Sequence, residues 1–260
     1  MTHLCLLQTL TAPATGPFPA MLIAMYFWAG MPAGQLLLGL SPILNIALFF
    51  LTGSLWWFVA LFAGLLAFAR PRILVLLLMV GINIGVGMAV PKIWDHMHDY
   101  QKRRIETFMN PEKDPSGSGY QVIQSKIAIG SGGVVGKGYL KGSQKALAFL
   151  PMRHTDFIYS VVGEELGLLG SLTVVLLYGI VILRGYRLAA IARDGFAGLM
   201  AVGITTALFF HVMVNMLMTI GWAPVTGVPL PFLSYGGTAL IVNCMQIGLL
   251  QNVALRRREY

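Results

Sequence analysis

The sequence predicts an all-α fold, a polytopic bundle of transmembrane helices with one long, structured loop on the outer side. Apolar residues make up 57% of the 260 residues and charged residues only 11%, about half the charge of an ordinary soluble domain. The apolar residues form runs of roughly 20, long enough to cross a hydrocarbon core of about 30 Å as helices. These runs are continuous and do not alternate with polar residues, which argues against membrane strands.

Six or seven helices are expected after an atypical N-terminal tail, residues 1–17. Residues 18–260 form the membrane domain, and residues 91–156 within it are too polar to span. No internal repeat is apparent, so the sequence gives no sign of an inverted-repeat transporter. The expected helices lie near 18–30, 36–51, 54–69, 73–90, 157–183, 196–220 and 236–255.

Clusters of arginine predict the orientation. Successive helices place all three clusters on one side of the membrane, which the positive-inside rule makes the cytoplasmic side. Residues 91–156 and the Pro- and Gly-rich residues 221–237 then share the opposite, outer side, where two loops could build one site. The clusters are Arg70 with Arg72, then Arg184, Arg187 and Arg193, and finally Arg256, Arg257 and Arg258.

The outer segment 91–156 is strongly basic. It holds ten of the 18 basic residues, including every lysine, against six acidic ones. Long loops are largely exempt from the positive-inside trend, so an anionic partner on the outer face is the expected reason for this charge. Within the segment, residues 120–129 could form a short amphipathic helix at the interface, which the glycines of 130–133 would end. We expect no nucleic-acid partner, and Cys5 and Cys244 are no plausible disulfide pair.

The most informative stretch is residues 149–170, where ionisable groups meet a long apolar run. Arg153, His154 and Asp156 stand at its entrance. Charge at membrane depth is expensive and usually marks a pathway or a reactive site. The alternative for Asp156 is an N-cap, in which its carboxylate accepts bonds from the first turn of the helix. Both roles can coexist, and we expect the function to centre on Asp156.

A face of small and polar residues follows on the same helix. Asp156, Ser160, Gly163 and Gly167 fall at i, i+4, i+7 and i+11, a pattern that suits a wet cavity. Small residues at this spacing equally permit close helix packing. Glu164 and Glu165 lie about two turns inside; one could face the cavity, and we expect a structural role for at least one.

The glycine-rich residues 130–138 superficially suggest a phosphate loop. The spacing fails, because Ser131 stands where the first glycine belongs and Gly138 replaces the final Ser or Thr. Flexible backbone amides with Lys137 and Lys141 could still cradle a phosphate.

The histidines have no metal-type spacing. We interpret His96, His98 and His154 as surface residues. His211 and Asn215, four apart in an apolar helix, are expected to bond between helices.

Three motifs together resemble the SEDS proteins, the shape, elongation, division and sporulation family of bacterial inner-membrane peptidoglycan glycosyltransferases. They read PMRHTDFIYSVVGEELG, GYQVIQSKIAIGSGG and GVPLPFLSYGG, and the resemblance runs from about Phe18 to the C-terminus. Arg153 before His154, with the run MNPEKDPSGSGY, is more similar to the rod-shape branch than to the division branch.

The chain departs from the family pattern at three points. Members have about ten spanning helices, more than expected here, and LTAPATG stands where the family has Gln-Pro-Asp-Leu-Gly-Thr. An N-terminal truncation or a frameshifted gene start would account for both. Met152 occupies a place where the family commonly has Glu.

The resemblance implies polymerisation of lipid II on the periplasmic face, with residues 91–156 as a periplasmic loop and Asp156 as the essential catalytic residue. The implied partners are a class B penicillin-binding protein, which supplies transpeptidation, and other membrane proteins of the elongation complex. No cofactor is certain, although a divalent cation could assist at the pyrophosphate. The expected substrate-binding residues are Arg153, His154, Lys126, Lys137, Ser160 and Glu164.

Two alternatives remain open at this point. A flippase for lipid-linked precursors would use the same basic outer loops and polar cavity. An inactive, truncated remnant would only contact partners.

Overall fold

The computed structural model describes residues 17–31, 99–113, 117–139, 141–142 and 156–256, together with positions 40, 81, 82, 84 and 85. Apart from these five helical positions, the helices expected near 36–51, 54–69 and 73–90 lie outside this description, as do Arg153 and His154. The chain divides into two compact units, Met1–Ala24 with Arg103–Tyr260 in one and Met25–Lys102 in the other. The first of these units holds the candidate site.

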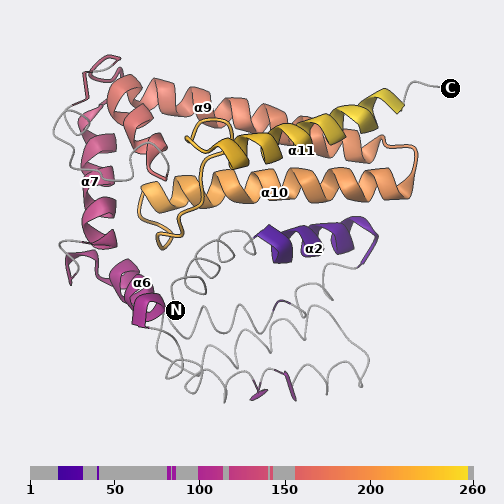
Figure 1. Ribbon diagram of the computed structural model, residues 1–260, viewed down its shortest axis with the longest axis horizontal. Helices are drawn as coiled ribbons and strands as arrows, with labels where there is room; N and C mark the ends of the chain where they lie inside the picture. The colour runs from indigo at the N-terminus through magenta and orange to yellow at the C-terminus, as the bar shows by residue number, and fades with distance from the viewer. Residues whose placement is uncertain are drawn as a thin grey trace. The chain divides into compact units, whose positions relative to one another are not determined.

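Every regular element in the described part of the chain is a helix, as the sequence predicts (Figure 1). Of these helices, α9, α10 and α11 are long and apolar enough to cross a membrane, and α2 is a shorter apolar helix. The elements are α2 (Pro17–Trp28), α6 (Asp99–Met109), the 3-10 helix η1 (Pro111–Lys113), α7 (Ser118–Ser131), α9 (Ile158–Ala190), α10 (Gly195–Thr219) and α11 (Gly237–Arg256).

The three long helices lie side by side, and α7 crosses their end (Figure 1). The most buried of them is α10, in which all residues from 201 to 208 are buried. Close approach of α9 to α10 depends on Gly185, where a Cβ atom would lie 2.3 Å from Thr205 Oγ1. The hydroxyls of Tyr186 in α9 and Thr206 in α10 are 3.0 Å apart and form a hydrogen bond between the same two helices.

The helix α9 is broken, where the sequence predicts one continuous helix over 157–183. Gly167 has φ 66° and ψ −159°, a backbone conformation that is essentially restricted to glycine. The break leaves a first half, residues 158–166, and a second half, residues 168–190. The second half also continues past the expected end at residue 183. It reaches Ala190 through a more polar stretch of helix that contains Arg184 and Arg187.

The amphipathic helix expected at 120–129 is present as α7. Its buried face follows helical spacing, with Val122, Ser125 and Ala128 all buried. Ser125 Oγ donates a 2.7 Å hydrogen bond to the carbonyl of Thr219, at the last residue of α10. This bond fastens α7 to the point where α10 ends and the loop 220–236 begins.

The loop 220–236 contains no α-helix, as its prolines and glycines predict. It is nevertheless tied down. Tyr178 of α9 donates its hydroxyl hydrogen to the carbonyl of Pro231, and the amide of Leu230 donates to Ser234 Oγ at 2.8 Å. Phe232 has a positive φ of 66°, which is rare for a non-glycine residue and marks a strained position.

Candidate functional site

Asp156 lies in the turn immediately before α9 and is half-buried. The N-cap of α9 is Phe157, which makes no side-chain cap hydrogen bond. The N-cap interpretation of Asp156 is therefore wrong. The physical reason is the packing of Phe157, which is 0% exposed. Phe157 occupies the cap position, so Asp156 lies one residue before the N-cap.

Asn215 of α10 holds the backbone at Asp156. Its Nδ2 donates to the carbonyl of Asp156 at 2.9 Å and to the carbonyl of Val228 at 2.7 Å. Asn215 is 0% exposed, and a buried amide with satisfied donors fixes both partners firmly. The expectation that Asn215 bonds between helices is wrong in detail, because both partners lie in non-helical segments. An Asn inside an apolar run was the available signal for this role.

The carboxylate of Asp156 faces the loop 220–236. A Cβ atom at Gly227 would lie 3.5 Å from Asp156 Oδ2, and Gly227 has φ +72°. A larger residue there would be strained and would press on the carboxylate. The structure thus brings Asp156 together with the loop 220–236, as the sequence predicts.

A cavity of about 620 Å³ opens at the start of α9. Its wall begins at Ile158, two residues after Asp156, and continues through residues 232–237 to Leu240. The volume falls in the usual range of about 300–1,000 Å³ for small-molecule sites. Aromatic and aliphatic side chains supply most of the lining, and Ser234 supplies a hydroxyl.

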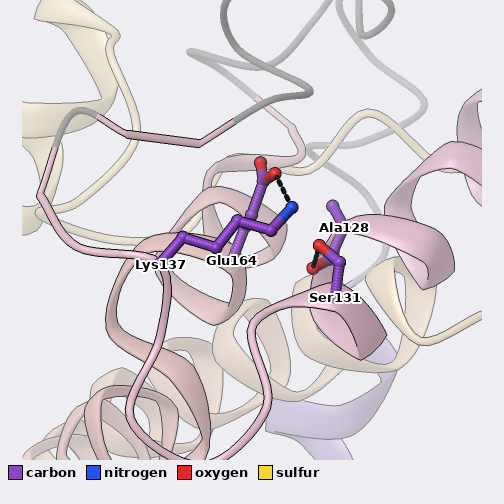
Figure 2. A network of polar contacts seen from close by, with 4 residues as sticks. All are labelled: Ala128, Ser131, Lys137 and Glu164. Atoms are coloured by element: carbon purple, nitrogen blue, oxygen red, sulfur yellow. Dashed lines mark hydrogen bonds and ion pairs between the residues drawn. The ribbon is translucent and has the colours of Figure 1, made fainter.

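Lys137 and Glu164 form an ion pair (Figure 2). Lys137 Nζ lies 2.8 Å from Glu164 Oε1, and the side chains are 31% and 1% exposed, respectively. An ionised carboxylate buried this completely requires a cation nearby. The pair therefore gives Glu164 the structural role that the sequence predicts for one of the two glutamates, and we leave both residues out of the substrate-binding set.

The expected wet face of the first half of α9 is wrong, and the packing alternative is confirmed. Ser160 is 0% exposed and donates its hydroxyl to the carbonyl of Phe157 at 2.6 Å. A Cβ atom at Gly163 would lie 3.1 Å from Ile129 Cγ1 of α7. Gly163 is small because α7 lies against it. Ser160 is buried and bonded to its own backbone turn, so we leave it out of the substrate-binding set as well.

Lys126 lies on the exposed side of α7. Its side chain runs along the start of the loop 220–236, since a Cβ atom at Gly221 would lie 2.6 Å from Lys126 Nζ. This position keeps Lys126 among the candidate anion-binding residues. Within the described ranges, no group of three or more His, Cys, Asp or Glu side chains could hold a metal ion.

Fold and site together define a polytopic α-helical membrane protein with a carboxylate that lies against the loop 220–236. A family model described as "Cell cycle protein", covering FtsW, RodA and SpoVE, matches residues 20–259. The chain therefore belongs to the FtsW/RodA/SpoVE family, which confirms the SEDS resemblance.

Curated relatives match at high identity. "Peptidoglycan glycosyltransferase MrdB" of Escherichia coli (strain K12) is 48% identical over 182 residues, which is 69% of this chain and 49% of the relative. "Probable peptidoglycan glycosyltransferase FtsW" of Geobacter metallireducens is 47% identical over 160 residues, 62% of this chain and 42% of the relative. The matched region thus spans about half the length of these relatives.

A solved structure is also similar. It is described as "Structural coordination of polymerization and crosslinking by a peptidoglycan synthase complex" and matches with a TM-score of 0.56 and 29% identity. The match covers 94% of this chain and 69% of the other.

Proposed function

We propose that this chain carries the catalytic region of a peptidoglycan glycosyltransferase that polymerises lipid II during cell-wall elongation. The observation that supports this most is Asp156, whose backbone carbonyl is held by Asn215 and which precedes by two residues Ile158, in the wall of a cavity of about 620 Å³. The names of the relatives, MrdB and FtsW, supply the reaction class. Relatives of the rod-shape and division branches match at similar identity, so the identities do not separate the two roles. We therefore assign the rod-shape role from the motif around Arg153.

In the proposed reaction, the Asp156 carboxylate accepts the proton of the acceptor 4-hydroxyl as a general base. The hydroxyl oxygen then bonds to the anomeric carbon of the donor sugar, and the bond from that carbon to the lipid pyrophosphate breaks. Direct displacement converts an α-linked donor into a β-linked product. Positive charge at the departing pyrophosphate would lower the barrier; Arg153 is proposed for this, and Lys126 less directly.

The test is reconstitution of the purified protein into lipid vesicles with lipid II, with moenomycin present to silence other polymerases. We expect polymer from the wild type and none from Asp156→Asn, because an amide cannot accept the proton. The fold should survive, since the N-cap of α9 is Phe157 and asparagine is about as well tolerated as aspartate at the start of a helix. Asp194→Asn is the matched control: it alters an exposed Asp at the opposite end of the long helices and should leave polymerisation unchanged.

Other outcomes separate the alternatives. Near-normal polymerisation by Asp156→Asn would remove the base assignment. Movement of lipid II between leaflets without polymer would support a flippase, and neither activity would support a remnant. The proposed partners, a class B penicillin-binding transpeptidase and elongation-complex membrane proteins, should co-purify with wild type and Asp156→Asn alike.

The proposed location is the bacterial inner membrane with a cytoplasmic C-terminus, because the Arg clusters alternate with the helices. This orientation puts Asp156 on the periplasmic face, where lipid II polymerisation takes place. A reporter active only in the periplasm, fused after Tyr260, should stay silent. A strong signal would overturn the orientation and put Asp156 on the wrong side.

A further inference from the structure

The break in α9 exposes four backbone groups that an unbroken helix would have paired. Carbonyl oxygens near the end of residues 158–166 lose their partners, and so do amides at the start of residues 168–190. Unpaired backbone groups away from water cost several kcal/mol each in a membrane protein, so such breaks persist only where protein groups satisfy them.

The glycine-rich residues 132–138, which we name the glycine loop, satisfy all four. The amides of Lys137 and Gly138 donate to the carbonyls of Glu164 and Glu165, each at 3.0 Å. In the other direction, the amides of Leu168 and Leu169 donate to the carbonyls of Gly133 and Val134, at 3.0 and 3.2 Å. The loop therefore bonds to both sides of the break and fixes the two halves of α9 relative to one another.

The contact is too close for side chains. A Cβ atom at Gly136 would lie 2.2 Å from the carbonyl oxygen of Glu165, and one at Gly132 would lie 2.0 Å from that of Gly163. A Cβ atom at Gly167 would lie 2.4 Å from the amide nitrogen of Gly136. Glycines that resemble a phosphate loop in sequence are thus explained by backbone-to-backbone packing.

The ion pair of Lys137 with Glu164 adds a charged bond to the same contact (Figure 2). Glu164 belongs to the first half of α9, which begins just after Asp156. Asn215 anchors one end of that segment, and the glycine loop anchors the other. A change in the direction of the first half between these two anchors would move the turn that carries Asp156.

From this arrangement we infer that Lys137 and Glu164 are a positioning pair that aligns Asp156 by clamping the first half of α9 to the glycine loop. The pair touches neither substrate nor reacting atoms. This inference rests on the proposed function for its kinetic consequence, whereas its structural consequence can be measured without turnover.

The kinetic test compares variants of the pair in the polymerisation assay. Lys137→Met should lower kcat about 10- to 100-fold, the loss typical of a reacting group misplaced by about 1 Å, while KM stays within about twofold. Lys137→Arg, which keeps the cation, should retain most activity. Tyr186→Phe removes a hydroxyl contact between α9 and α10 far from Asp156 and should leave kcat unchanged.

Lys137→Met also leaves a buried carboxylate without its cation and could impair folding. The double variant Lys137→Met/Glu164→Gln removes both charges and avoids that penalty. It should reach normal membrane abundance and still show the lowered kcat. Normal kcat in the folded double variant would overturn the inference, because the pair would then contribute only stability.

The structural test measures the distance between spin labels at Val162 and Leu183, one in each half of α9, after Cys5 and Cys244 are changed to Ser. The wild type should give one narrow distribution, and Lys137→Met and the double variant should broaden it. Tyr186→Phe should not. A narrow distribution in the double variant would overturn the inference, whether or not the protein polymerises lipid II. If the two variants broaden the distance distribution but the wild type makes no polymer from lipid II, the proposed function is rejected and the structural inference is not.

Discussion

The two halves of α9 are parts of one helix in sequence but lie in different surroundings. In residues 158–166 the side chains of Ser160, Glu164 and Glu165 are buried, at 0%, 1% and 5% exposed. In residues 168–190 large apolar side chains face outward, with Leu168 and Leu183 each 61% exposed. The first half is specified by individual partners, whereas the outward face of the second half is specified by hydrophobicity. Substitutions should therefore be felt strongly in one half and weakly in the other.

The largest expected effect is at the junction between the halves. Gly167→Ala should lower the free energy of unfolding by about 3 kcal/mol or more, because the residue has φ +66° and its Cβ would lie 2.4 Å from a backbone nitrogen. Gly179→Ala is the matched control in the second half, where a Cβ atom meets nothing within 4 Å. Alanine there should be neutral or stabilise by up to about 1 kcal/mol.

Thermal unfolding in detergent compares the two alanine variants directly. Equal stability of both would mean that α9 passes Gly167 without the break. In that case the glycine loop would have no exposed backbone groups to satisfy.

A smaller effect is expected where the first half is anchored. Asn215→Leu leaves the carbonyls of Asp156 and Val228 without their shared donor. We expect a loss of about 2 kcal/mol in unfolding free energy and a lower kcat, because the turn carrying Asp156 loses its attachment to α10. Asn252→Leu, at an exposed position of α11, is the control and should change neither quantity. Normal kcat in Asn215→Leu would show that the glycine loop suffices to align Asp156.

Much of the fold can be predicted from the sequence because membrane spans depend on composition. The three long helices appear as apolar runs, α7 appears as a helical spacing of Val122, Ser125 and Ala128, and the loop 220–236 appears as prolines and glycines. Asp156 is also visible in sequence, as a charge at the start of an apolar run. Its proximity to Gly227 follows from both segments lying on the same side.

The break in α9 could not be predicted, because a single glycine in an apolar run is compatible with a continuous helix. What stabilises the break is the glycine loop, and Lys137 and Glu164 are 27 positions apart. Asn215 and Asp156 are 59 positions apart. Burial of Phe157, which displaces the helix cap, is likewise a tertiary effect. Such contacts depend on how the segments fold against one another, and no local pattern encodes them.

The smallest effect is expected in the second half of α9, where Leu176 is 58% exposed. Leu176→Ala should change the unfolding free energy by no more than about 0.5 kcal/mol. In water, truncating a leucine removes hydrophobic burial, but in a bilayer the side chain contacts lipid tails both before and after the helices separate, so little transfer free energy is at stake. Unfolding of the protein in lipid, measured beside Gly167→Ala, checks this directly. A loss of about 2 kcal/mol would contradict it, since only a side chain packed against protein gives a loss of that size. The outward face of the second half would then be a protein contact, and the contrast between the two halves would disappear.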